Sequence, residues 1–263
     1  MSMKLQGHHA LITGGGTGIG AAIARALAAE GAKLTLVGRR REKLEEVAAS
    51  CSPAKAGVHR DYGSRPSPGQ LVAPADVTMR SEVDRAFALA REAQGPIAIL
   101  INNAGAAAGV PFAKVTEAVW RDMLAVNLDG MFHCCQAALS DLLAADSGRI
   151  VTVASMAGLH GFAYASPYIA AKHGAVGLTR ALAAEYSGTR LRVNAVCPGF
   201  VESDMTAGSI ANIAAKTGRS AEEARAELAR LNPSGRLIAP EEVAAAVLDL
   251  LLSDRNGEAV EIA

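Results

Sequence analysis

Short apolar segments alternate with longer helical ones along almost the whole chain. Seven short runs rich in aliphatic and β-branched residues have the composition of strands; they lie at residues 10–13, 33–37, 71–73, 97–101, 149–153, 192–196 and 259–262. Amphipathic or alanine-rich segments lie between them, among them residues 19–30, 42–50, 81–94 and 241–252. Strands that are apolar at nearly every position are typical of a parallel sheet covered on both faces. The alternation therefore predicts an α/β fold, with residues 1–263 as a single domain around a doubly wound parallel sheet of about seven strands.

Charge and hydropathy exclude two classes of partner. The 26 lysines and arginines equal the 26 aspartates and glutamates, so no net field draws the chain to nucleic acid or anionic lipid, and only a local basic patch stays open. No apolar run reaches the roughly 18 residues that cross a membrane. The first residues are too polar for a secretory signal, and the four cysteines lack metal-site or redox-motif spacing. We therefore expect a cytoplasmic protein with reduced thiols, no metal and a small molecule as its partner.

Two segments interrupt the alternation. Residues 51–70 are rich in proline and glycine and predict a surface loop. Residues 201–235 are polar and alanine-rich, with a helix expected at 221–231, and they follow the carboxyl end of a strand. That position is typical of a substrate lid. Ahead of the first strand, His8 and His9 are interpreted as surface residues rather than metal ligands.

The glycine-rich segment Thr-Gly-Gly-Gly-Thr-Gly-Ile-Gly, at residues 13–20, joins the first strand to the first helix. Gly14 and Gly18 let the backbone turn sharply and approach a pyrophosphate, and Gly20 lets the helix pack close to the strand. The N–H groups and the dipole at the start of the helix favour phosphate charge. The segment predicts a Rossmann-type dinucleotide site; the alternative is a tight strand–helix turn without a ligand.

The end of the second strand distinguishes between the two nicotinamide cofactors. An NAD site usually has an acidic residue here to accept hydrogen bonds from the ribose 2′-hydroxyl, whereas this chain has Gly38 followed by Arg39, Arg40 and Arg41. A planar guanidinium can donate two charge-assisted bonds to a 2′-phosphate. We therefore expect NADP(H) to be preferred over NAD(H). The alternative is a solvated, basic start of the next helix.

Tyr168 and Lys172 lie near a predicted helix start, where Ser166 can cap the helix and Pro167 can occupy its first turn. Residues four apart share one face of a helix and can point into one site. A free tyrosine has a pKa of about 10, too high for an efficient base near neutrality. A nearby ammonium and a positive nicotinamide ring favour the phenolate, and lowering the pKa to about 7 takes roughly 4 kcal/mol. The spacing alone is common by chance on helices.

Together these motifs resemble those of the short-chain dehydrogenase/reductase family, and the match covers nearly the whole chain. Six motifs occur in the family's order and at its spacing: the glycine-rich turn at 13–20, Asn102-Asn103-Ala104-Gly105, Asn127, Ser155 thirteen residues before Tyr168, the pair Tyr168 and Lys172, and Pro198-Gly199. Six ordered motifs are far more specific than any one of them.

The resemblance implies four catalytic residues: Ser155, Tyr168, Lys172 and Asn127. In the reductive direction, Tyr168 would donate a proton to the carbonyl oxygen as hydride arrives, and Ser155 would hydrogen-bond that oxygen. Lys172 would hold the nicotinamide ribose and lower the Tyr168 pKa. Asn127 would position a water that links Lys172 to solvent. Two simpler roles stay open, namely Asn127 as a residue at a helix kink and Ser155 as a small packing residue.

The same resemblance implies how the cofactor is bound. Asp76 and Val77 would lie against the adenine, Asn103 against the adenosine-side ribose, and Val201 and Ser203 at the nicotinamide carboxamide; Asp76 could instead cap the end of a strand. The full expected set is Gly14, Thr17, Gly18, Ile19, Gly20, Arg39, Arg40, Asp76, Val77, Asn103, Ala104, Gly105, Tyr168, Lys172, Pro198, Gly199, Val201 and Ser203.

The expected function is that of an NADP(H)-dependent oxidoreductase that moves a hydride between the nicotinamide and a carbonyl or secondary alcohol. Residues 214–231 resemble the corresponding segment of relatives that act on 3-oxo or 3-hydroxy acids and their acyl thioesters, including polyketide ketoreductases. His160, Phe162 and Tyr164 either line the substrate pocket or pack a loop. The alternative is a non-catalytic, dinucleotide-binding regulatory protein, which would be expected to lack part of the catalytic set.

Relatives assemble through long helices, so the resemblance also implies a homotetramer or a homodimer. The apolar, alanine-rich faces of residues 119–143 and 169–186 are compatible with such contacts. They could equally serve the core of one subunit.

Overall fold

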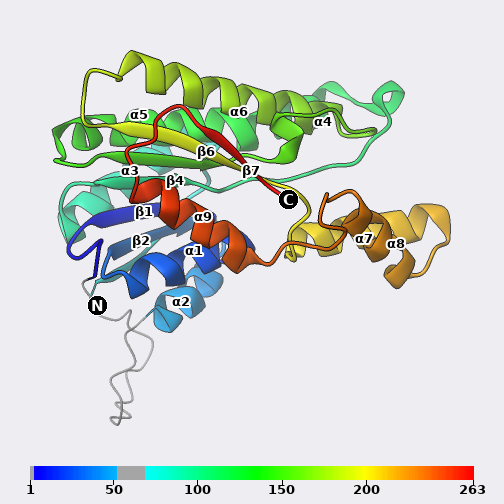
Figure 1. Cartoon of the computed structure of the whole chain (residues 1–263), viewed down its shortest axis with the longest axis horizontal. Helices are drawn as coiled ribbons and strands as arrows, with labels where there is room; N and C mark the ends of the chain where they lie inside the picture. The colour runs from blue at the N-terminus through cyan, green and yellow to red at the C-terminus, as the bar shows by residue number, and fades with distance from the viewer. Residues whose placement is uncertain (1–2, 52–68) are drawn as a thin grey trace, which may run out of the picture.

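The computed structural model describes residues 3–51 and 69–263, which form one parallel sheet with helices on both faces (Figure 1). In this part of the chain the seven strands follow the order β3-β2-β1-β4-β5-β6-β7. They are β1 (His9–Thr13), β2 (Lys33–Gly38), β3 (Gln70–Pro74), β4 (Ile99–Asn102), β5 (Arg149–Val153), β6 (Arg192–Pro198) and β7 (Ala259–Ile262). The direction of the order reverses between β1 and β4, as in a doubly wound sheet. The predicted sheet is confirmed.

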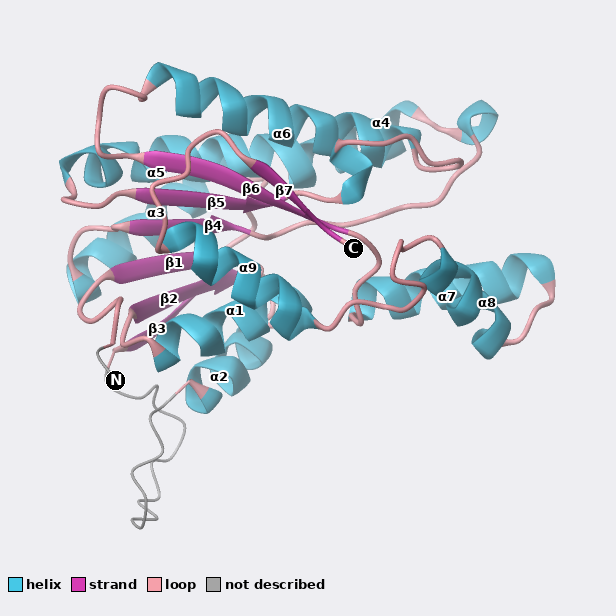
Figure 2. Ribbon diagram, in the orientation of Figure 1, coloured by secondary structure: helices cyan, strands magenta, loops and turns pink. Residues whose placement is uncertain are grey.

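Helices cover both faces of the sheet (Figure 2). One face carries α1 (Gly18–Ala29), α2 (Arg41–Ser50) and α9 (Pro240–Leu251), and the other carries α3 (Arg80–Gln94), α4 (Glu117–Leu124), α5 (Gly130–Ala144) and α6 (Ser166–Glu185). Successive side chains of a strand point to opposite faces. Ala10 and Ile12 therefore pack with α1 and α9, while Leu11 packs with α3 and α5. Burial on both faces explains why the strand is apolar without alternation.

The segment between β6 and α9 forms two helices that extend beyond the sheet, α7 (Asp204–Thr217) and α8 (Ala221–Arg230) (Figure 1). Helix α8 confirms the helix expected at 221–231, and Ser220 and Glu223 form a capping box at its start. Helix α7 was not expected, although Ser203 supplied a local signal: its hydroxyl accepts a hydrogen bond from the Thr206 N–H and caps the helix.

Two other expectations concern the loop at residues 51–70 and the lack of a membrane-spanning segment. Most of the loop expected at 51–70 falls on residues 52–68, which lie outside the described residues. Within residues 3–51 and 69–263, no helix has both the length and the apolar character needed to cross a membrane.

His9 is buried, so its interpretation as a surface residue was wrong. Strand β1 begins at His9, whose side chain is only 2% exposed. Its Nδ1 lies 2.8 Å from the Gly95 carbonyl oxygen, and its Nε2 lies 2.9 Å from the Thr35 hydroxyl. A neutral imidazole with its proton on Nδ1 satisfies both contacts, because Nδ1 then donates and Nε2 accepts. Complete pairing of both ring nitrogens makes the burial of this polar side chain possible.

We expect acid to destabilise the wild-type protein more than its His9→Gln variant. Burial lowers the pKa of His9 below its ordinary value, so on acidification the unfolded chain binds a proton before the folded chain does. The stabilisation due to neutral His9 is present above the unfolded pKa of about 6.5 and is lost as the pH falls below it, by at most about 1.4 kcal/mol per pH unit. Urea unfolding of both proteins from about pH 7 to about pH 5 measures this difference. Identical pH dependences would contradict the assignment.

Candidate active site

A cleft of about 810 Å³ runs along the carboxyl ends of the strands. This volume lies in the range typical of small-molecule and cofactor sites. The expected site residues that line the cleft are Gly14, Thr17, Gly18, Ile19, Arg39, Arg40, Asp76, Val77, Asn103, Ala104, Gly105, Ser155, Tyr168, Lys172, Pro198, Gly199, Val201 and Ser203. Gly20 and Asn127 are not part of its lining. The fold therefore gathers almost all of the expected residues, from segments far apart in sequence, into one cavity.

The turn between β1 and α1 has the geometry that its glycines allow. Gly14 and Gly18 have φ values of 64° and 50°, a region that favours glycine. A Cβ atom on Gly20 would lie 2.2 Å from the Gly14 carbonyl oxygen, so a side chain there would force α1 away from β1. The turn therefore brings the N-terminus of α1, with its unpaired N–H groups, to the floor of the cleft.

Hydrogen bonds connect this turn to the segment that follows β4. The Thr13 hydroxyl accepts from the N–H groups of Asn103 and Ala104, at 3.0 and 3.1 Å. The side-chain nitrogen of Asn103 donates to the carbonyl oxygens of Thr13 and Gly14, at 3.0 and 3.1 Å. Asn103 thus faces the cleft as expected, but its amide nitrogen is used to hold the glycine-rich turn.

Arg39 lies at the end of the cleft next to β2. Its side chain is 80% exposed, and its guanidinium lies 4.0 Å from the carboxylate of Asp76, which follows β3. Asp76 also accepts hydrogen bonds from the N–H and the hydroxyl of Thr78, at 2.9 and 2.8 Å. Asp76 therefore has the capping role that the sequence left open, and it also lines the cleft. Arg40 lines the same end of the cleft.

Helix α6 brings Tyr168 and Lys172 to the cleft beside Ser155, which follows β5. The Lys172 Nζ lies 5.7 Å from the centre of the Tyr168 ring and donates a hydrogen bond of 3.0 Å to the Val153 carbonyl oxygen. The expected cap at the start of α6 was wrong. The helix begins one residue earlier than a Ser166 cap would place it, with Ala165 at the N-cap position, and the buried Ser166 hydroxyl has no hydrogen-bond partner among the described residues.

The pKa values at this site differ from the sequence expectation. Burial raises the pKa of Tyr168 above its ordinary value, and a hydrogen bond with Ser155 opposes the rise. Burial also lowers the pKa of Lys172 to about 8, because a charged group loses its hydration in the interior. Without the cofactor, burial therefore keeps Tyr168 protonated at neutral pH.

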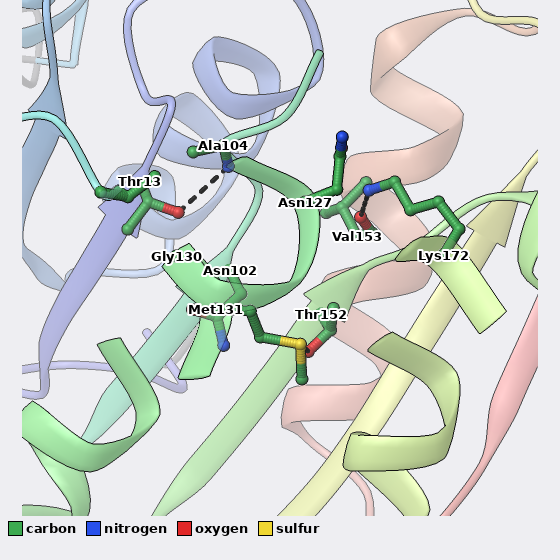
Figure 3. A pocket seen from close by; sticks show the side chains of 10 residues that line it. Thr13, Asn102, Ala104, Asn127, Gly130, Met131, Thr152, Val153 and Lys172 are labelled. Carbon is green, nitrogen blue, oxygen red and sulfur yellow. Dashed lines mark hydrogen bonds between the residues drawn. The ribbon is translucent and has the colours of Figure 1, made fainter. Parts of the chain in front are cut away.

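Asn127 lies behind the cleft, next to a small cavity beside Lys172 (Figure 3). The cavity measures about 10 Å³, close to the room that one water needs. Asn127 belongs to the π-helical turn Ala125–Asp129 between α4 and α5, so it does sit at a helix irregularity. Its side-chain nitrogen donates to the carbonyl oxygens of Ala106 and Met123, at 2.9 and 3.0 Å, and its oxygen accepts from the Ala106 N–H at 3.3 Å.

Two groups that hold the site together were not predicted from the sequence. The Thr13 side chain was noted only as part of the glycine-rich motif, although a hydroxyl at the end of a strand is a signal for such bonds. The Val153 carbonyl oxygen, which holds Lys172, has no sequence signal because any residue presents one (Figure 3).

Residues 8–214 match the model of a protein family described as short chain dehydrogenase. The chain belongs to this family. Among its relatives, 2-(S)-hydroxypropyl-CoM dehydrogenase 3 of Xanthobacter autotrophicus is 38% identical over 255 residues, which are 97% of this chain and 93% of the relative. As a short-chain dehydrogenase, the protein is an oxidoreductase that works with a nicotinamide dinucleotide.

Two solved structures of short-chain dehydrogenases resemble this one closely. A variant of the actinorhodin polyketide ketoreductase with NADPH has a TM-score of 0.87 and 34% identity, covering 97% of this chain and 95% of that chain. Levodione reductase has a TM-score of 0.87 and 34% identity, covering 98% of this chain and 97% of that chain. The fold is therefore shared over nearly the whole chain.

We expect Asn127→Asp to destabilise the protein by about 3 kcal/mol or more at neutral pH, because it buries a carboxylate against two carbonyl oxygens. The loss should shrink in acid, where a protonated carboxyl can donate a hydrogen bond. Urea unfolding at two pH values measures both effects. Asn212→Asp, the same change at an exposed position of α7, is the matched control and should change stability little. A loss at residue 127 no larger than that at residue 212 would contradict the role of Asn127.

Proposed function

We propose that this short-chain dehydrogenase prefers NADP(H) and reduces a carbonyl compound or oxidises the corresponding secondary alcohol, with Ser155, Tyr168 and Lys172 at the reaction centre. The observation that carries the proposal is the presence of all three side chains in the cleft that also contains the glycine-rich turn. A regulatory protein that only binds a dinucleotide would not need this set. The catalytic function is therefore favoured.

The residues around the cleft fit both the pyrophosphate and the 2′-phosphate of NADP(H). The glycine-rich turn leaves no room for side chains at Gly14 and Gly20, where an added Cβ would lie 2.8 and 2.2 Å from its nearest neighbours. The start of α1 offers N–H donors to a pyrophosphate. Arg39, held near Asp76 and largely exposed, can reach a 2′-phosphate at the end of β2.

The side chains at the other end of the cleft can move the proton that the reaction requires. A bound, reduced nicotinamide supplies the hydride. Tyr168 donates its phenolic proton to the carbonyl oxygen, and its raised pKa keeps that proton in place before reaction. Ser155 donates a hydrogen bond to the same oxygen as negative charge develops there. The Lys172 ammonium then stabilises the phenolate that Tyr168 becomes.

Several further features belong to the same proposal. Residues 1–263 act as one domain, and residues 201–235 form its substrate lid, because Met205, Thr206 and Ser209 of α7 line the cleft.

Exposed Trp120 and Phe132, on α4 and α5, support assembly into a homodimer or homotetramer. Four free, buried cysteines support a reducing, cytoplasmic location.

We expect Tyr168→Phe to reduce kcat about 10²- to 10⁴-fold, because the variant loses the proton donor and keeps the ring. Ser155→Ala should reduce kcat about 10²-fold or more through loss of the hydrogen bond to the developing oxyanion. NADPH oxidation with a panel of ketones and 3-oxoesters measures both, and the dissociation constant of NADPH in each variant separates catalysis from binding. Wild-type turnover without loss in Tyr168→Phe would contradict the proposed mechanism.

The preference for NADP(H) is tested at Arg39. We expect Arg39→Ala to lower kcat/KM for NADPH about 10- to 100-fold and to change that for NADH little, since only NADPH has a 2′-phosphate to accept charged hydrogen bonds. Arg41→Ala is the control, because Arg41 begins α2, pairs with Glu45 and does not line the cleft. Equal losses with the two cofactors would show that Arg39 does not select between them.

A further inference from the structure

The substrate end of the cleft is the part lined by residues 106–109, Phe162, Ala165, Phe200 and Met205. Hydrogen bonds connect three of the segments that supply these residues, and we call the residues together the wall of the substrate end. The Val110 N–H donates to the Tyr164 carbonyl oxygen at 2.7 Å, which connects the segment after β4 to the segment that precedes α6. The Lys216 Nζ donates to the Gly109 carbonyl oxygen at 3.4 Å, which connects α7 to the first of these segments.

This wall is apolar or made of small residues. Alanine and glycine occupy positions 106–109, and the larger side chains are two phenylalanines and a methionine. The uncharged polar side chains that α7 adds are Thr206 and Ser209. Thr206 is buried and already bonded to the Ser203 hydroxyl, at 3.4 Å. A substrate with many hydroxyl groups would therefore leave most of them without partners.

The charges around the cleft disfavour an anionic substrate. Among the described residues that line it, the cationic side chains are Arg39, Arg40, Lys43 and Lys172. The first three follow β2, which is three strand spacings, or about 14 Å, from β5 and Ser155. Lys172 is buried and bonded to the Val153 carbonyl oxygen.

Asp76 lines the cleft beside Arg39, and the other two acidic side chains of its described lining make this bias stronger. They are Asp122 of α4 and Asp204 of α7, and α7 also supplies Met205 of the wall. Lys216 approaches Gly109 but does not line the cleft. A carboxylate bound beside Ser155 and Tyr168 would therefore lose hydration without gaining an ion pair.

We propose that the substrate is a neutral and largely apolar ketone, or the corresponding secondary alcohol, in which the reacting oxygen is the main polar group at the substrate end. Free 3-oxo acids and polyols are then poor substrates, whereas neutral esters and amides of the same 3-oxo acids are accepted. This inference rests on the proposed function and narrows it, because the sequence left the free acids open.

The test compares acetoacetate with acetoacetamide, which has nearly the same shape and the same reacting ketone but no charge. We expect kcat/KM with NADPH to be on the order of 100-fold higher for the amide, since the charged group finds no partner. In the oxidative direction with NADP⁺, cyclohexanol should be oxidised and sorbitol should not. Comparable values for acetoacetate and acetoacetamide, or faster oxidation of sorbitol than of cyclohexanol, would overturn the inference.

Two variants of Met205 show whether the charge of the wall sets the preference. The ratio of kcat/KM for acetoacetamide to kcat/KM for acetoacetate should fall about fivefold in Met205→Arg, as expected for a partly exposed ion pair. Met205→Gln, which is polar but uncharged, should leave the ratio within the error of the wild-type value. An equal ratio in all three proteins would overturn the electrostatic explanation.

The same assays separate this inference from the proposed function. Turnover that is lost in Tyr168→Phe but shows no preference for neutral substrates would overturn only the inference. No turnover of any of the four probes with either cofactor would overturn both.

Discussion

The site depends on the hydrogen bonds between the Thr13–Gly14 corner and the Asn103–Ala104 segment. They join the carboxyl ends of β1 and β4, the two strands between which the order of the sheet reverses. Loops diverge at such a point and leave a crevice. Without a fixed geometry there, the glycine-rich turn could not present the start of α1 to a dinucleotide. Two backbone N–H groups, one hydroxyl and one amide therefore define the position of the proposed cofactor end of the cleft.

A second connection places the proposed reacting groups relative to that end. The Lys172 ammonium bonds to the carbonyl oxygen of Val153 at the end of β5, so α6 cannot slide along the sheet without breaking a buried, charged hydrogen bond. Tyr168 lies one turn earlier on the same helix, and Ser155 follows the same strand. Burial gives Lys172 a lower pKa and Tyr168 a higher one. The site is thus arranged so that the tyrosine holds its proton, which suits reduction at neutral pH.

Much of this architecture could be predicted from the sequence because it rests on repeated patterns. The alternation of apolar runs and amphipathic segments predicted the sheet, and ordered motifs predicted which residues the cleft would gather. Interactions that depend on tertiary contact could not be predicted. His9 is buried because Gly95 and Thr35 happen to lie opposite its two nitrogens. Burial raises the pKa of Tyr168 although Lys172 lies one turn away, and no residue type signals which main-chain carbonyl oxygen will bind Lys172.

The central claim is that a hydride passes from the nicotinamide to a carbonyl carbon while Tyr168 supplies the proton. It is tested most directly with NADPH that carries deuterium at both positions of nicotinamide C4 and with the ketone that is turned over fastest. With the wild-type protein, mass spectrometry should detect alcohol that carries one deuterium on the carbinol carbon. With Tyr168→Phe, it should detect almost no deuterated alcohol after the same reaction time. Alcohol that forms without deuterium, or deuterated alcohol that forms equally fast in the variant, would contradict the account.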